Sequence, residues 1–313
     1  MKKLTVLLWN FEENGRNNPD KRRRAHEKLL SHNPHLILRQ EMAGANADGN
    51  AIMYELEAIL GLRGWLGHGS CTAVFADPRV FQTVRELPAA ALWTLPPTAL
   101  IMRYLPAGHD AMPLAVASYH LNYASPTQRN LETEWLSTLA DKKWTTPDGR
   151  TVRMPCLIAG DNNSYPAPGV DGDPALPVLD EIRDRPHRLH RSLVGPDGSR
   201  VMDTRPDETL RTAGLEDVAR HRAIKRGDKT AVARTVNACA THGPDARVDR
   251  FYATAGVLEA VTDMDVIEVP EHISDHHIVR LALSGDHLAD VLNEQQSPLA
   301  ALQRGGRRTS GAA

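Results

Sequence analysis

Acidic, amide and histidine side chains recur directly beside short apolar runs of this sequence. If these runs are strands of stacked sheets, the polar side chains lie where the strands end, and the loops there can converge at one rim. The residues are Asn10, Gln40 and Glu41, His120 and Asn122, Asp161 and Asn163, Arg247 and Asp249, and Asp275 with His276. The pattern predicts one polar site assembled from segments that are far apart in the chain.

Three residues of this set could bind a divalent cation that prefers oxygen ligands. Mg²⁺ prefers carboxylate and carbonyl oxygens and keeps several waters, and Glu41, Asp275 and the amide of Asn10 supply such oxygens. A bound Mg²⁺ neutralises charge on phosphate oxygens and polarises a leaving group. A histidine held by a carboxylate can orient or deprotonate water, because the carboxylate fixes its tautomer and stabilises the imidazolium. Together these groups predict metal-assisted hydrolysis of a phosphate ester.

Each motif alone has a simpler interpretation. Asp275 and His276 could be surface residues of a loop, and Gly160–Asn163 is typical of a turn. Asn10 could simply end a strand. The order of the motifs along the chain therefore carries more information than any one of them.

The ordered set resembles the endonuclease/exonuclease/phosphatase superfamily, which includes deoxyribonuclease I and abasic-site endonucleases. That family shows a strand ending in Asn, a Gln-Glu pair, a strand end with His, Gly-Asp-x-Asn, Arg-hydrophobic-Asp and Ser-Asp-His. The corresponding segments here are Asn10, Gln40–Glu41, His120, Gly160–Asn163, Arg247–Asp249 and Ser274–His276, within about residues 4 to 284. The resemblance implies an α/β protein, a four-layer α/β/β/α sandwich with two mixed, mainly antiparallel sheets.

The resemblance also implies which residues hold the metal and the substrate. Asn10, Glu41 and Asp275 would bind Mg²⁺, with Mn²⁺ as an alternative ion and the number of ions left open. Asn122 and Arg247 would contact the substrate.

Five further residues carry the catalytic roles that the resemblance implies. His276 would orient water and contact the phosphate, with Asp249 as its carboxylate partner. Asp161 and Asn163 would orient the nucleophile and bind phosphate oxygens. His120 would stabilise the leaving group or donate a proton to it. The identity of the base stays open among these groups.

The positioning elements are predicted from short Val-, Ile- and Leu-rich runs bounded by turn residues, and from apolar residues at helical spacing. Strands are expected at Leu4–Trp9, Leu36–Leu38, Cys71–Ala76, Leu100–Tyr104, Leu114–Tyr119, Met154–Ile158, Val248–Ala253, Val257–Val266 and Ile278–Leu283. Helices are expected at Pro19–Ser31, Asn50–Leu60 and Thr127–Lys143. The short Pro/Gly loop between Leu100–Tyr104 and Leu114–Tyr119 indicates an antiparallel hairpin.

One domain is expected over residues 1–290, followed by a polar, disordered tail over 291–313. Residues 164–235 differ from the rest, because they are rich in Pro, Gly, Asp and Arg. Between Arg183 and Arg234 there are 13 Lys and Arg against 8 Asp and Glu, an excess of 13 − 8 = 5, together with His187, His190 and His221. This stretch is either a solvated insertion or a lobe that binds an anionic substrate.

Composition is that of an ordinary soluble protein, with 41% hydrophobic and 24% charged residues and a net charge of −2. No apolar run approaches the ~20 residues of a membrane span. The cysteines, Cys71, Cys156 and Cys239, are widely spaced and are expected to be buried reduced thiols. Together these features predict a cytoplasmic protein without an obligate protein partner.

The predicted activity is that of a hydrolase of phosphate esters, with a nucleic acid as the first expected substrate. The basic stretch and the basic run Lys21–Arg24 favour a nuclease, whereas the near-neutral charge and 5% aromatic content do not. The alternative is a phosphatase or phosphodiesterase acting on inositol phosphates, lipid head groups or another small molecule. A non-catalytic binding protein of the same fold is disfavoured, because every main position carries a chemically competent residue.

Overall fold

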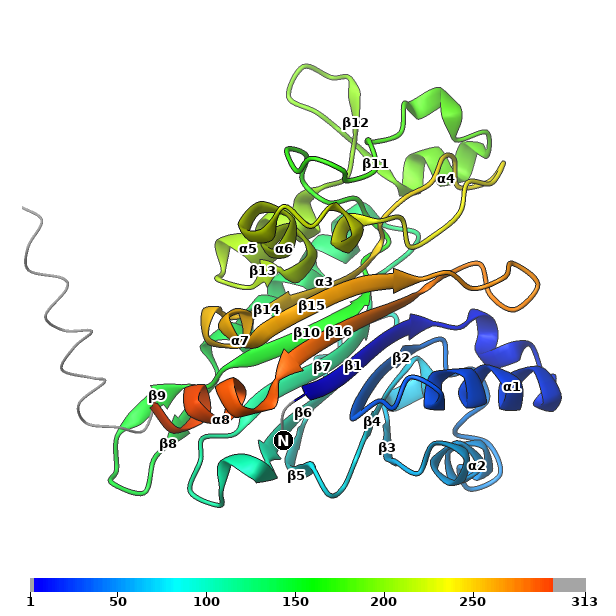
Figure 1. The fold of residues 1–313 in the computed structure, drawn as a ribbon. Coiled ribbons are helices and arrows are strands. Elements are labelled where there is room, and N and C mark those ends of the chain that lie inside the picture. Colours follow the sequence, from blue (N-terminus) through cyan, green and yellow to red (C-terminus); the bar gives the residue numbers. More distant parts are fainter. Residues whose placement is uncertain (1–2, 295–313) are drawn as a thin grey trace, which may run out of the picture.

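Two six-stranded sheets form the centre of the computed structural model, which describes residues 3–294 (Figure 1). The first sheet has the order β15-β16-β1-β2-β4-β3 and the second the order β13-β14-β10-β7-β6-β5. The first contains β1 (Lys3–Asn10), β2 (Leu36–Gln40), β3 (Arg63–Leu66), β4 (Thr72–Ala76), β15 (Val261–Ile267) and β16 (Ile278–Ser284). The second contains β5 (Phe81–Leu87), β6 (Thr98–Tyr104), β7 (Leu114–His120), β10 (Cys156–Asp161), β13 (Glu216–Asp217) and β14 (Asp249–Ala253).

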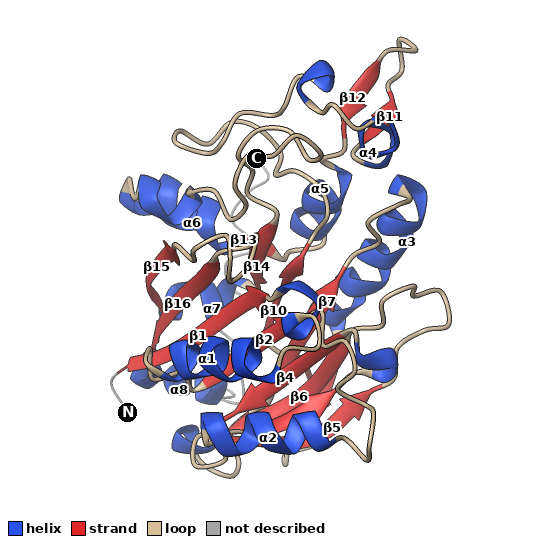
Figure 2. Cartoon of the chain, turned by 90° about the vertical axis from the view of Figure 1, so that its right-hand side faces the viewer, coloured by secondary structure: helices blue, strands red, loops and turns tan. Residues whose placement is uncertain are grey.

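Helices α1 and α2 pack on the outer face of the first sheet and α3 and α5 on that of the second, and two small hairpins lie outside the sheets (Figures 1 and 2). The helices are α1 (Pro19–Leu30), α2 (Ala51–Leu60), α3 (Pro126–Ser137), α4 (Arg185–His190), α5 (Arg205–Thr212), α6 (Val218–Arg226), α7 (Ala255–Ala260) and α8 (Gly285–Glu294). The hairpins are β8 (Lys143–Thr145) with β9 (Thr151–Arg153), and β11 (Ser192–Val194) with β12 (Arg200–Met202).

Alternation along the strands divides the apolar side chains among layers. Leu4, Val6 and Leu8 of β1 belong to the core between the two sheets, whereas Leu7 and Trp9 pack outward with residues of α1 and α2. This follows from the period of two of a β-strand, whose successive side chains point to opposite faces. On the other side, residues of β7 and β10 pack against α3 and α5. The predicted four-layer sandwich is confirmed.

Each sheet has one parallel strand pair at its centre, and this pair determines where the polar residues meet. β1 pairs in parallel with β2, and β7 with β10, while the other pairs of both sheets are antiparallel. The carboxyl ends of parallel neighbours lie at the same edge, and an antiparallel neighbour begins there. β14 and β16 are such neighbours, so the start of each lies beside the ends of the parallel pair.

Most of the predicted strands and helices are present, with two differences in their bounds. The hairpin of β6 and β7 is antiparallel as predicted. The strand expected from Val257 is wrong at its start, because Ala255–Ala260 forms α7 and only the residues from Val261 pair with β16. The third predicted helix ends early, since residues 138–141 tighten into a 3₁₀ turn and Lys143 begins β8.

The prediction of buried cysteines is confirmed only for Cys156. Cys239 is exposed and Cys71 is half-buried, and all three thiols are free.

The stretch 164–235 is more regular than its composition predicts. It contains α4, the β11–β12 hairpin, α5, β13 and α6. β13 joins the second sheet and Leu210 of α5 packs in its outer core, so this half is part of the sandwich. The segment of α4, β11 and β12 extends from one end of the sandwich in both views (Figures 1 and 2).

The prediction of a disordered tail over 291–313 is wrong for its first four residues, 291–294, which are helical. α8 continues through Glu294, with Val291 and Leu292 buried. Leu288, Val291 and Leu292 share one helix face by their spacing, which the polar composition of this region concealed. The remainder of the predicted tail, 295–313, lies outside the described residues. No helix within residues 3–294 has the length and hydropathy needed to cross a membrane.

A buried ion pair joins α3 to the projecting segment. Arg129 of α3 donates two hydrogen bonds to Asp203 (Nε 3.1 Å and Nη2 2.9 Å to Oδ2), and both side chains are fully buried. Nη2 of Arg129 also donates to the carbonyl of His190 at 2.7 Å. The guanidinium therefore ties α4 and the start of α5 to the sandwich.

Replacing Arg129 by Met should lower the free energy of unfolding by about 3–5 kcal/mol, because the buried Asp203 would lose its partner. Urea denaturation measures this change. Arg153→Met is the matched control: its pair with Asp141 is 75% and 58% exposed, so the expected loss is at most ~1 kcal/mol. Equal losses in the two variants would contradict the assigned role of Arg129.

Candidate active site

A cavity of about 210 Å³ opens where the ends of the two parallel strand pairs meet. The sandwich contributes its acidic side, with residues from the ends of β2, β7 and β10 and from the loop before β16. The segment between β10 and β14 contributes the other side. The lining residues are Glu41, His120, Tyr123, Asp161, Asn163, Tyr165, His187, Arg191, Val236, His242, Pro244, Ala246, Val248, Asp275 and His276.

Asn10 links the two sheets at the base of the cavity. Its side-chain Nδ2 donates to Glu41 Oε1 and to Asp161 Oδ2, each at 3.2 Å. The amide oxygen Oδ1 of Asn10 is buried without a hydrogen-bond donor within the described residues, and so is Oδ1 of Asp275. A buried acceptor without a partner is costly, and a bound cation would satisfy both oxygens. Two such oxygens and the carboxylate of Glu41 fit the donor set that Mg²⁺ requires.

The backbone is strained at two of the polar residues. Glu41 has φ +55° and Asn163 has φ +48°, both in the left-handed region. A non-glycine residue held in a sparsely populated region of φ and ψ costs about 1–3 kcal/mol and is found preferentially at functional sites. The strain at Glu41 is supported locally, because its Oε2 accepts a hydrogen bond from the Glu13 amide at 2.6 Å.

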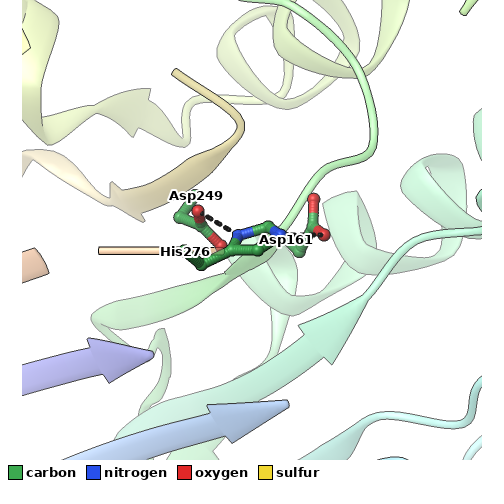
Figure 3. A group of neighbouring side chains, drawn as sticks. All are labelled: Asp161, Asp249 and His276. Carbon is green, nitrogen blue, oxygen red and sulfur yellow. Dashed lines mark hydrogen bonds and ion pairs between the residues drawn. The ribbon is translucent and has the colours of Figure 1, made fainter. Parts of the chain in front are cut away.

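Asp161, Asp249 and His276 lie together, with the imidazole between the two carboxylates (Figure 3). Nδ1 of His276 is 2.7 Å from Asp249 Oδ2, and its Nε2 is 3.9 Å from Asp161 Oδ2. Burial opposes the charged imidazole, but the charge and hydrogen bond of Asp249 prevail and raise the pKa of His276 to about 10. At neutral pH this imidazole is therefore a cation held by Asp249. The three groups place one ligand atom each within 4.8 Å of one another, so they also meet the distance requirement for a cation.

His120 approaches Asp161 from the neighbouring strand. Its Nε2 is 3.4 Å from Asp161 Oδ2, as expected from the direct pairing of these residues between β7 and β10. Burial opposes charge on His120, but the contact with Asp161 outweighs it and raises the imidazole pKa. Burial alone would also raise the pKa of Asp161, yet the hydrogen bond from His120 and the charges of both histidines hold it far below its ordinary value. Asp161 is therefore the ionised centre of this cluster.

Several small contacts fix the strand ends. A Cβ at position 160 would lie 1.8 Å from the Tyr119 carbonyl oxygen, so only glycine permits β10 to approach β7 before Asp161. Ser274 Oγ donates to the Asn10 carbonyl at 3.2 Å and accepts from the His276 amide at 3.3 Å. Thr235 Oγ1 accepts from the amides of Val248 and Asp249, both at 3.0 Å.

The structure brings eight of the ten predicted site residues together and leaves two apart. Asn122 is 6% exposed, and its amide is used within the protein: Nδ2 donates to Thr94, and Oδ1 accepts from the Ala124 and Ser125 amides. Arg247 is 2% exposed and binds Asp173 through Nε and Nη2 and Asp217 through Nη1. Neither side chain lines the cavity, because each completes a buried polar network of its own.

Other lining residues were not predicted, chiefly Tyr165, Arg191 and His242. These three residues belong to the segment between β10 and β14, and no sequence motif identifies any of them as a site residue. His187 was noted only as one histidine of a basic stretch. The useful signal was local composition, since a basic segment inserted between two site motifs must lie near that site.

Comparisons with known proteins support the fold. No family model matches the chain, and no curated protein matches it in sequence. D. rerio TDP2 in complex with a single-strand DNA product is similar in structure at a TM-score of 0.56 and 12% identity, over 90% of this chain and 98% of that one. An AP endonuclease from Archaeoglobus fulgidus gives 0.57 and 14% over 90% and 99%. An endonuclease/exonuclease/phosphatase from Bacteroides vulgatus gives 0.56 and 15% over 91% and 99%. The chain has the DNase I-like fold, as its sequence predicted.

Proposed function

We propose that this protein is a Mg²⁺-dependent phosphodiesterase that cleaves a phosphate ester by attack of water. The observation that carries the proposal is the convergence of Glu41 and Asp275 with the cluster of Asp161, His120 and His276 in one cavity. Asn10 is hydrogen-bonded to Glu41 and Asp161, and its Oδ1 and that of Asp275 are acceptors without a partner within the described residues. When bound beside Asn10, Glu41 and Asp275, Mg²⁺ supplies charge neutralisation and polarisation of the ester. The similar solved structures include an AP endonuclease and an endonuclease/exonuclease/phosphatase, which supports the same reaction class.

The residues of the cluster have distinct proposed roles. Asp161 is ionised, so it orients the attacking water and accepts its proton as the oxygen–phosphorus bond forms. His276 is held as a cation by Asp249 and donates a hydrogen bond to a phosphoryl oxygen, which stabilises the charge that develops there. His120 donates a proton to the leaving oxygen as that bond breaks. Hydrolysis of a diester then yields one alcohol and one phosphate monoester.

A nucleic acid is the first candidate substrate. It is supported by the similarity to the TDP2 structure that contains a single-strand DNA product. A small phosphorylated molecule is the second candidate, supported by the enclosure of the cavity by Tyr165, Arg191 and His242 of the projecting segment and its flanks. A salt titration separates the two, because activity on a polyanion falls steeply with salt concentration.

Removal of divalent metal should abolish the activity. EDTA-treated protein is expected to be inactive on supercoiled, abasic and single-stranded DNA, RNA, inositol phosphates and bis(p-nitrophenyl) phosphate. Added Mg²⁺ should restore turnover on at least one of them, with Mn²⁺ as the alternative ion. Glu41→Gln should raise the Mg²⁺ concentration for half-maximal activity more than about tenfold, since it removes a charged ligand. Full activity in EDTA would exclude the proposed metal role.

We place the protein in the cytoplasm. Its cysteines are all free, including the exposed Cys239, which suits a reducing compartment. Fractionation of cells that express a tagged chain tests this placement.

A further inference from the structure

Arg191 is a buried cation in the wall of this cavity. It is only 8% exposed, and it lines the same cavity as Asp161 and His276. Its Nη1 is buried without a hydrogen-bond partner, and no carboxylate within residues 3–294 forms an ion pair with it. Other cations of this basic stretch are neutralised, such as Arg205 by Asp203 and Arg222 by Asp228. A buried guanidinium without a salt-bridge partner is costly, so a bound anion would stabilise this site.

Two imidazoles stand beside this guanidinium. His187 and His242 stack with ring centroids 4.2 Å apart and an interplanar angle of 23°, and both line the cavity. Burial and then the charge of Arg191 lower the pKa of His187 to about 3, and the same two causes lower the pKa of His242. Both rings are therefore neutral at pH 7 and can donate one N–H each. Nε2 of His187 is buried without a partner.

The backbone holds Arg191 in this position. It is the C-terminal cap of α4, where its amide donates to the His187 carbonyl at 2.9 Å. The Arg191 carbonyl accepts from the Asp203 amide at 3.0 Å, and Arg129 fixes the preceding His190 carbonyl. The main chain at position 191 is thus held in place, and the side chain that it carries is buried in the cavity wall.

We propose that Arg191 and His187, with His242 beside them, form a subsite that binds a second phosphate group of the substrate. This inference rests on the proposed function, in which the first phosphate lies at Asp161 and His276. A guanidinium fork with unused N–H groups matches a phosphate in geometry and charge. Val236, Pro244 and Val248 line the same cavity and provide an apolar wall for the group that joins the two phosphates. The second phosphate belongs either to a small bisphosphorylated molecule or to the next nucleotide of a strand.

Binding of inorganic phosphate to metal-free protein tests the subsite without any turnover. Isothermal titration calorimetry is expected to show one phosphate bound to the unaltered protein. Arg191→Met should raise the Kd for phosphate more than about tenfold, because all charge-assisted hydrogen bonds of the guanidinium are lost. Arg191→Lys should raise it less, because the charge and part of these bonds remain. Arg188→Met on the same helix is the matched control, since Arg188 is 34% exposed and paired with Asp180. Unchanged affinity in Arg191→Met, or no binding to the unaltered protein, would overturn the subsite.

A matched pair of chromogenic substrates then tests its use in catalysis. Thymidine 5′-(p-nitrophenyl phosphate) has one phosphate, and its 3′-phosphorylated derivative has two. Arg191→Met should lower kcat/KM on the two-phosphate substrate at least about tenfold more than on the one-phosphate substrate, because only the former has a group that occupies the subsite. Equal losses on both would place Arg191 on the scissile phosphate and refute the subsite. A dinucleotide and an inositol bisphosphate, compared in the same way, distinguish the two sources of the second phosphate.

The two proposals can fail separately. Asp275→Asn is expected to abolish Mg²⁺-dependent hydrolysis while leaving phosphate binding at Arg191 intact. Phosphate binding that depends on Arg191 in a protein without hydrolytic activity would reject the proposed function and keep the subsite. Metal-dependent hydrolysis of the two-phosphate substrate that is unchanged in Arg191→Met would reject the subsite and keep the proposed function.

Discussion

Substitution of Asp161 by Asn should lower kcat by about 10²- to 10⁴-fold, the range of a lost general base. Asp161 is the group through which the cluster is connected: its Oδ2 lies 3.2 Å from Asn10 Nδ2, 3.4 Å from His120 Nε2 and 3.9 Å from His276 Nε2. The amide that replaces it has nearly the same shape but carries no charge and cannot accept the proton of water. Initial rates at saturating Mg²⁺ measure the loss.

A control and a folding measurement accompany this variant. Asp180→Asn removes a carboxylate that is 92% exposed and pairs only at 3.5 Å with Arg188, so it should leave kcat unchanged. Far-UV circular dichroism and thermal unfolding establish that Asp161→Asn is folded. A folded Asp161→Asn protein with full turnover would remove Asp161 from the proposed mechanism.

The pair of His276 and Asp249 should act as one unit. Their contact of 2.7 Å is the shortest among the catalytic side chains described above, and Asp249 is only 1% exposed. His276→Ala is expected to lower kcat by about 10²- to 10⁴-fold, and Asp249→Asn by a smaller factor, because it removes only the support of the imidazole. The double variant should be no more than about threefold slower than His276→Ala alone, since groups that work through each other are not additive.

The double-mutant cycle distinguishes a relay from independent contacts. If the two losses multiply in the double variant, Asp249 acts on the reaction by a route other than His276. His277→Ala provides a comparison, because His277 follows His276 directly but bonds to the Val269 amide and to Asn237 outside the lining of the cavity. It should affect stability more than kcat.

The placement of the polar residues at strand ends could be predicted because it depends on local pattern. A short continuous run of Val, Ile and Leu that ends in Asn10, Gln40 or Asp161 can be recognised as a buried strand without knowledge of any long-range contact. Their convergence followed from the resemblance in motif order. The left-handed backbone at Glu41 could not be predicted, because nothing in Arg-Gln-Glu demands it without the surrounding contacts that hold it.

Segments without periodicity were predicted least well. The residues of α7 from Val257 on were assigned to a strand. Val257 and Leu258 are buried apolar residues that suit a helix as well as a strand, and a short apolar run does not distinguish the two. Asn122 and Arg247 were assigned to the substrate because polar residues next to site motifs fit that role. Their buried partners, such as Thr94 and Asp217, lie far from them in the sequence.

The sequence by itself determined the strand ends and the residue types suited to metal-assisted phosphate chemistry, because these are local properties. The order of its motifs implied the DNase I-like sandwich through the family resemblance. Only the tertiary structure decided which polar residues share the cavity and which are used in internal networks. It also placed Arg191 and His187 in the same cavity as Asp161, although no spacing in the sequence connects them. Such a juxtaposition depends on how α4 and the β11–β12 hairpin pack onto the sandwich through Arg129 and Asp203, and that packing is a property of long-range contacts.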